Sequence, residues 1–250
     1  MLIPLLVTGV VGGFLSGFFG VGGGIIMVPL LMLWAKFDQK RASATSLLAI
    51  VPTSLVGSLT YAAQSQVDVL VAVFVSIGAI VGAPFGSKLL RVLPVAVVHW
   101  VFITMMVIEA ARLLFVTDET HGSFELTIAS AVGLIGLGLL MGVASGMLGI
   151  GGGVIAVPVF MSVFGLAPLL AKGTSLLAMV PTAISGTIPN LKAGLVVLKE
   201  GLIVGVAAVA ASFGGVAVAF VLPDQLSAQL FGVLLLGVAI QSAVLRVKRK

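Results

Sequence analysis

The sequence predicts an all-α polytopic membrane protein made of two inverted repeats, each a glycine-tipped helical hairpin followed by three transmembrane helices. Three observations predict this class: the composition, a long repeated motif and the placement of the basic residues. Hydrophobic residues make up 60% of the chain and charged residues only 8%, whereas soluble domains carry about 25% charged residues. Several apolar runs reach the ~20 residues that cross a bilayer.

The composition also excludes several kinds of chemistry. The chain has no cysteine, which removes disulfides, thiol catalysis and thiolate metal sites. The formal charge of +5 comes from basic residues in short loops, where it indicates membrane orientation rather than nucleic-acid binding. The sequence has neither a cluster with metal-ligand spacing nor a phosphate-binding loop. We therefore expect no metal, no cofactor and no nucleic-acid partner.

The repeat is visible in two pairs of motifs. "SGFFGVGGGIIMVP" begins at Ser16 and "SGMLGIGGGVIAVP" begins 129 residues later at Ser145, with nine of fourteen positions identical. "TSLLAIVPT" at Thr45 and "TSLLAMVPT" at Thr174 have the same offset. One fixed offset predicts two structurally similar halves. We assign residues 1–116 to the first transmembrane repeat, 117–125 to an extracytoplasmic linker and 126–250 to the second repeat.

The apolar segments give the crossings in order. In the first half they lie near 1–35, 43–63, 68–90 and 92–116, and in the second near 126–164, 173–191, 201–222 and 226–245. Most fit one crossing each. As a single helix, 126–164 would be about 58 Å long at 1.5 Å per residue, against a hydrocarbon core of ~30 Å. We interpret it, and its counterpart 1–35, as a helical hairpin that turns at the glycine run and returns to the same side.

The lysines and arginines favour this hairpin. With it, eleven of the thirteen basic residues fall on one side of the membrane. If each glycine run were part of a single crossing, the twelve basic residues in loops would divide evenly. The positive-inside tendency therefore predicts hairpins and cytoplasmic termini. An odd number of full crossings per half then makes the halves inverted.

The glycines suggest a binding site. Glycine weakens a helix by about 1 kcal/mol per position, but it permits turns with positive φ and close approach of a ligand to the backbone. The second arm of each hairpin begins with N–H groups that lack helical partners and carry the positive end of the helix dipole. Two such tips would bind an anion. Close helix packing is the other interpretation of the glycines. The candidate binding residues are Gly20, Gly22, Gly23, Gly24, Gly149, Gly151, Gly152 and Gly153.

Polar side chains on the helix after each hairpin are further candidates. A hydroxyl can donate to an anion's oxygen, or it can satisfy the carbonyl that a proline kink frees. The candidates are Thr45, Ser46, Thr53, Thr174, Ser175, Thr182 and Asn190.

Three charged residues fall inside or beside the apolar segments. Glu109 and Arg112 are three residues apart, a spacing that allows a pair on one helix face. They are candidates for proton coupling and anion attraction, or for a structural ion pair. Lys172 is expected in the outer loop, where it would attract anions or remain a solvated surface lysine.

The two glycine motifs and the two "TSLLA" helices resemble those of the sulfite exporter TauE/SafE family of membrane permeases, and the likeness extends over nearly the whole chain. This resemblance implies movement of sulfite or an organosulfonate such as sulfoacetate, often outward, across the bacterial inner membrane. Of the family's functional residues, only the glycine and Thr-Ser positions carry over.

The expected function is a secondary transporter that exports a small sulfur-containing anion by alternating access. An anion channel or a uniporter for another small anion is the alternative. An intramembrane enzyme would need a catalytic constellation that this sequence lacks, so we predict no enzyme activity. The expected partners are the anion and the lipid bilayer, with a homodimer left open.

Overall fold

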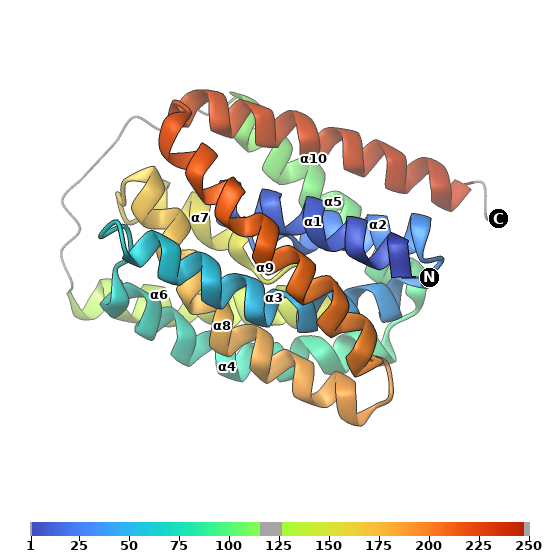
Figure 1. The fold of residues 1–250 in the computed structure, drawn as a ribbon. Coiled ribbons are helices and arrows are strands. Elements are labelled where there is room, and N and C mark those ends of the chain that lie inside the picture. The colour runs from blue at the N-terminus through green and yellow to red at the C-terminus, as the bar shows by residue number, and fades with distance from the viewer. Residues whose placement is uncertain (1, 116–126, 248–250) are drawn as a thin grey trace.

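The computed structural model describes residues 2–115 and 127–247, which form ten α-helices and no strand (Figure 1). The linker assigned to 117–125 lies outside these residues. In the first half the helices are α1 (Leu2–Phe19), α2 (Gly24–Trp34), α3 (Gln39–Ala62), α4 (Val69–Val92) and α5 (Val95–Phe115). In the second half they are α6 (Ile128–Leu148), α7 (Gly153–Ser162), α8 (Pro168–Lys192), α9 (Leu198–Val221) and α10 (Asp224–Val247).

The all-α polytopic class is confirmed. Within the described residues, eight helices are long and apolar enough to cross a membrane: α1, α3, α4, α5, α6, α8, α9 and α10. The remaining two, α2 with 11 residues and α7 with 10, are too short to cross. Each half therefore contains a long helix, a short helix and then three long helices, which is the predicted order.

The first helix of each half packs against a helix of the other half. α1 packs along α9, and α6 packs along α4. A Cβ atom on Gly13 would overlap the backbone of Ala208, and one on Gly142 would overlap the carbonyl oxygen of Ala79. The same overlap recurs one helical turn before and after, at Gly9, Gly17, Gly138 and Gly146. These glycines let the backbones approach as small residues do in membrane helix pairs.

The equivalent helices α3 and α8 run antiparallel at the centre of the bundle. Gly57 of α3 faces Leu176, near the start of α8, while Gly186, near the end of α8, faces Leu47. With the exchange of α1 and α6, this contact relates the halves by an approximate two-fold axis across the helices. Inverted repeats require such a relation, and their inversion with respect to a membrane stays a prediction.

The first arm of each hairpin ends inside the bundle. Gly17 lies against Ser212, so α1 ends about seven residues before α9 does, or about 10 Å at 1.5 Å per residue. Gly146 lies against the backbone of Ala83, which gives α6 the same register along α4. Both glycine tips are therefore held near the middle of the bundle and not at its ends.

The close helix contacts generate a stability prediction. We expect Gly13→Ala to lower the free energy of unfolding by about 2 kcal/mol, because its methyl group would overlap the backbone of α9. The control is Gly136→Ala, since a Cβ atom there meets nothing within 4 Å and alanine is the better helix former. Unfolding in detergent followed by circular dichroism measures both. Equal effects of the two substitutions would contradict this packing.

Candidate functional site

The two tips share one backbone conformation. After α1, Gly20, Gly22 and Gly23 have φ values of 71°, 76° and 70°. After α6, Gly149, Gly151 and Gly152 have φ values of 71°, 79° and 83°. Side chains other than glycine are strained in this left-handed region. The chain therefore turns between the two arms at the same three positions of each repeat, as the glycine run predicts.

The tips also touch each other directly. A Cβ atom on Gly24 would overlap the carbonyl oxygen of Gly149 and lie 2.8 Å from Cα of Ile150. A Cβ atom on Gly153 would lie 2.9 Å from the carbonyl oxygen of Gly20 and 2.7 Å from Cα of Val21. These contacts are equivalent under the 129-residue offset, so the two-fold axis passes between the tips. Gly24 and Gly153 thus serve close packing, the other interpretation of the motif.

The tip amides are buried and lack acceptors. Gly20 N–H donates to Ser16 O and Gly149 N–H donates to Ser145 O, both within 2.9 Å. Beyond them, the backbone N–H groups of residues 21–25 and 150–154 find no acceptor among the described residues. All of these residues are buried. Since a buried helix N-terminus without partners is rare, the two tips hold an unused set of donors.

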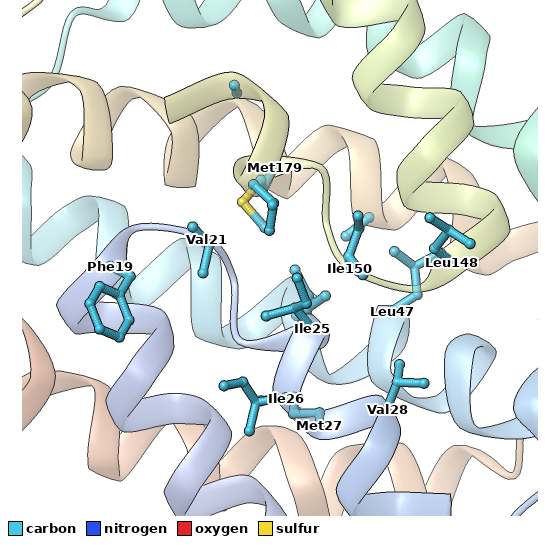
Figure 2. Close-up of a cluster of buried hydrophobic side chains, with 14 of the residues drawn as sticks. Phe19, Val21, Ile25, Ile26, Met27, Val28, Leu47, Leu148, Ile150 and Met179 are labelled. Atoms are coloured by element: carbon cyan, nitrogen blue, oxygen red, sulfur yellow. The ribbon is translucent and has the colours of Figure 1, made fainter. Parts of the chain in front are cut away.

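Two apolar side chains fill the space against the tips. The thioether of Met179 on α8 lies where Cβ atoms on Gly22 and Gly151 would be, and its sulfur is 3.0 Å from a Cβ atom placed on Gly153. Figure 2 shows Met179 beside Val21 and Ile150, one from each tip. Its repeat counterpart on α3, Ile50, contacts the same glycines from the other half. In this conformation the tips are covered by hydrocarbon and sulfur.

The hydroxyl candidates divide by their distance from the tips. Ser46 is closest, because its Oγ donates to the carbonyl oxygen of Gly149 at 2.9 Å. The Oγ of Ser175, its counterpart, lies 3.8 Å from the sulfur of Met179. Thr53 and Thr182 each donate to a carbonyl oxygen four residues earlier in their own helix, as expected near a proline kink.

The other polar candidates form no hydrogen bond to the tips in the described part of the chain. Thr45 is buried and its Oγ1 has no partner among the described residues. Thr174 accepts a hydrogen bond from the backbone N–H of Asp68 at 2.9 Å, at the end of the bundle where α4 begins. Asn190 is eleven residues beyond Met179 on α8, about 16 Å along the helix, where its amide reaches Ser87 Oγ at 3.4 Å. Ser46 therefore bonds to a tip, and Ser175 contacts the Met179 that covers it. Thr174 and Asn190 bond to groups outside the tips.

Sequence reasoning missed two serines at the tips. Ser16 and Ser145 open the two glycine motifs, are fully buried, and have Oγ atoms without a partner among the described residues. Ser16 Cβ lies 3.2 Å from a Cβ atom placed on Gly23. Serine is the first residue of both motifs, and this repetition is the sequence feature that could have identified the two residues.

The charged candidates have different outcomes. Lys172 is not in an outer loop: α8 begins at Pro168, and Lys172 is a buried helical residue that donates to Ser227 Oγ at 3.2 Å. That expectation was wrong because the helix begins at a proline well before the apolar run. Arg112 donates to the carbonyl oxygen of Pro158 at 3.2 Å and to Ser162 Oγ, which ties α5 to the end of α7. The side chain of Glu109 lies outside the described part of the structure, so the predicted pairing with Arg112 stays a prediction.

An ion pair that the sequence did not predict joins the two halves at one end. Arg41 at the start of α3 donates to both carboxylate oxygens of Glu200 at the start of α9, at 2.8 and 2.7 Å. The guanidinium also lies 4.1 Å from the ring centre of Phe37. Glu200 is buried, so the pair is shielded from solvent on one side. The equivalent positions at the other end, Val71 and Leu170, are apolar.

The described residues do not bring three His, Asp or Glu side chains together as a metal site would require. The tips are therefore the arrangement with a defined chemistry. Unpaired backbone donors at two helix N-termini favour a small anion.

Comparison with known proteins identifies relatives over most of the chain. The family model described as "Sulfite exporter TauE/SafE" matches residues 1–113 and 134–250. The probable membrane transporter protein YdhB of Bacillus subtilis is 29% identical over 198 residues, covering 77% of this chain and 81% of the relative. The probable membrane transporter protein YunE of the same organism is 28% identical over 218 residues, covering 77% and 79%. No solved structure matches the chain.

The hydrogen bond between Ser46 and the tip generates a prediction. We expect Ser46→Ala to lower the free energy of unfolding by about 1 kcal/mol, because the Gly149 carbonyl loses its donor. The control is Ser175→Ala at the equivalent position, whose hydroxyl faces a sulfur, a weak acceptor. Chemical unfolding in detergent compares the two. A loss for Ser175→Ala as large as for Ser46→Ala would contradict the assignment.

Proposed function

The chain belongs to the sulfite exporter TauE/SafE family and is a membrane transporter, and from this premise we propose that it is a secondary transporter of a small sulfur-containing anion. Sulfite and organosulfonates such as sulfoacetate are the proposed substrates, with export as the direction. An inside-negative potential favours the departure of an anion by about 2.3 kcal/mol per charge per 100 mV, so export needs no coupling ion in principle.

The observation that carries this proposal is the set of unpaired N–H groups at the two tips. These donors are buried, converge from both halves, and lie at the positive ends of α2 and α7. An anion accepts hydrogen bonds from such groups and repays the cost of burying them. The hydroxyls of Ser16, Ser46, Ser145 and Ser175 are the side chains we propose as further ligands.

The arrangement of the two halves supports alternating access. The antiparallel contact of α3 with α8 and the exchanged helices are what inverted repeats would produce, and transporters of this kind bind their substrate near the midplane, where the repeats meet. The ion pair of Arg41 with Glu200 joins the two halves at one end. We propose that it holds that end closed and separates when the site opens there.

Basic residues at the start of α3 and the end of α4 gather at the end that contains this ion pair. Lys40 donates to the carbonyl oxygen of Arg91 at 2.8 Å, and Arg91 donates to that of Pro189 at 3.3 Å. α1 begins and α10 ends at the same side of the bundle (Figure 1). The positive-inside tendency makes this end cytoplasmic. We therefore propose a bacterial inner membrane location with both termini in the cytoplasm.

Binding by the tip amides has a direct test. We expect the double variant Gly22→Ala, Gly151→Ala to bind sulfite at least about tenfold more weakly, which is 1.4 kcal/mol. Both positions have positive φ and face the thioether of Met179. Added methyl groups would therefore overlap that flexible side chain, and would come no closer than 3.2 Å to Ile50. Isothermal titration of the purified protein measures the dissociation constant.

The matched control for that test is Gly194→Ala. Gly194 has a φ of 69°, and a Cβ atom there meets nothing within 4 Å. The Gly194→Ala variant thus has the same backbone strain far from the tips, and it should bind sulfite as tightly as the unaltered protein does. Unchanged binding in the double variant would overturn a site made by these amides.

Counterflow distinguishes the transporter from the alternative of an anion channel. We expect proteoliposomes loaded with unlabelled sulfoacetate to take up labelled sulfoacetate transiently above its equilibrium level, because an alternating site exchanges one anion for another. The control is empty liposomes with the same gradient. Flux that rises linearly with concentration and shows no overshoot would indicate a continuous pore.

A further inference from the structure

The side chain of Met179 lies where the proposed substrate would lie. Its Cε atom is against Gly22 of one tip and Gly151 of the other, and its sulfur is beside Gly153. The residue is fully buried. Ile50 reaches the same two glycines less closely, at 3.4 Å from a Cβ atom on Gly22 and 3.2 Å from one on Gly151. The glycines of both tips therefore meet at this thioether.

A thioether is a poor partner for these donors. Its sulfur is a weak hydrogen-bond acceptor and its methyl group accepts none. An ordinary core methionine packs on hydrocarbon, whereas the end of this one faces backbone whose N–H groups lack acceptors. The present arrangement leaves the donors unsatisfied, which an oxyanion in the same place would correct.

The two repeats have different side chains at this position, a rigid one (Ile50) and a flexible one (Met179). Ile50 is β-branched and has few rotamers in a helix. Met179 has three rotatable side-chain bonds and adapts to irregular space. The part that would leave, Cγ, Sδ and Cε, has three heavy atoms, and sulfite has four. Withdrawing one side chain therefore frees roughly the room that a small oxyanion needs.

We propose that Met179 is a removable plug of the anion site, which fills the space between the tips in the empty state and sets the size of the anion that is admitted. This inference rests on the proposed function, since it assumes that the tips bind the substrate. The substrate class it favours is a compact oxyanion such as sulfite over a longer organosulfonate.

Binding measurements test the plug. We expect Met179→Ala to bind sulfite about fivefold more tightly, because the anion no longer has to displace a side chain from the competent state. Sulfoacetate should gain more than sulfite does. The matched control is Met27→Ala: Met27 is fully buried, packs on Gly12 and has its sulfur 4.0 Å from Ser46 Oγ. This variant removes the same volume away from Gly22 and Gly151, so neither anion should bind more tightly.

A second measurement does not depend on a cavity-forming variant. In protein labelled with ¹³C at the methionine methyl groups, the resonance of Met179 is assigned by its loss in Met179→Leu, a substitution of similar volume. We expect this resonance to shift on addition of sulfite by more than that of Met27, whose methyl group packs on Gly12. Leucine also lacks the reach of the thioether, so Met179→Leu should bind sulfite at least as tightly as the unaltered protein.

The outcomes separate the two proposals. If Met179→Ala and Met27→Ala affect sulfite and sulfoacetate alike, or the Met179 resonance does not respond, the plug is wrong. If in that case the variant Gly22→Ala, Gly151→Ala still loses binding, the tip site stands without a plug. If sulfite and sulfoacetate fail to bind the unaltered protein, the proposed function fails, and the plug with it.

Discussion

The structure depends on burying two helix N-termini against each other without giving their N–H groups an acceptor. The groups at residues 21–25 and 150–154 lie within the bundle and find no partner in the described parts of the chain. Burying unpaired polar groups costs free energy, so the rest of the fold has to hold them in place. The reciprocal contacts of Gly24 with Gly149 and of Gly153 with Val21, and the close packing of α1 on α9 and α6 on α4, perform this role.

Glycine meets two demands at the tips that no other residue meets together. Gly20, Gly22 and Gly23 need positive φ, whereas Gly24 needs the absence of a Cβ atom because the backbone of the second tip occupies that space. The choice between a binding role and a packing role for the motif is therefore not exclusive. Packing brings the two tips together, and the turn leaves their buried N–H groups without acceptors.

The helices and hairpins could be predicted from the sequence because they depend on local features: apolar runs of a given length, breaks at glycine, and a repeat at a fixed offset. The contacts of individual side chains could not be predicted in this way, because they depend on residues far apart in the sequence. Lys172 precedes an apolar run and was expected in a loop, but its burial depends on Ser227, 55 residues away. In the sequence Met179 has the spacing of an ordinary core residue. Its position between two tips from opposite halves becomes visible only in the structure. Arg41 and Glu200 are 159 residues apart, so no local pattern predicts their pairing.

The proposed site of backbone dipoles would suit a transporter that alternates between two states and returns empty. A lysine at the centre would bind an anion strongly, but after release it would leave an unpaired charge in a low-dielectric interior, which costs far more than unpaired amides. In this structure Arg41 is paired with Glu200 at one end. Lys172 packs its Cα and Cβ atoms against Gly20, while its ammonium group donates to Ser227 and lies beside Phe18. The neutral tips leave a smaller penalty in the empty state, and a thioether that covers them excludes water without forming strong bonds to them. The same weakness that makes Met179 a poor partner for the amides would make it easy to displace.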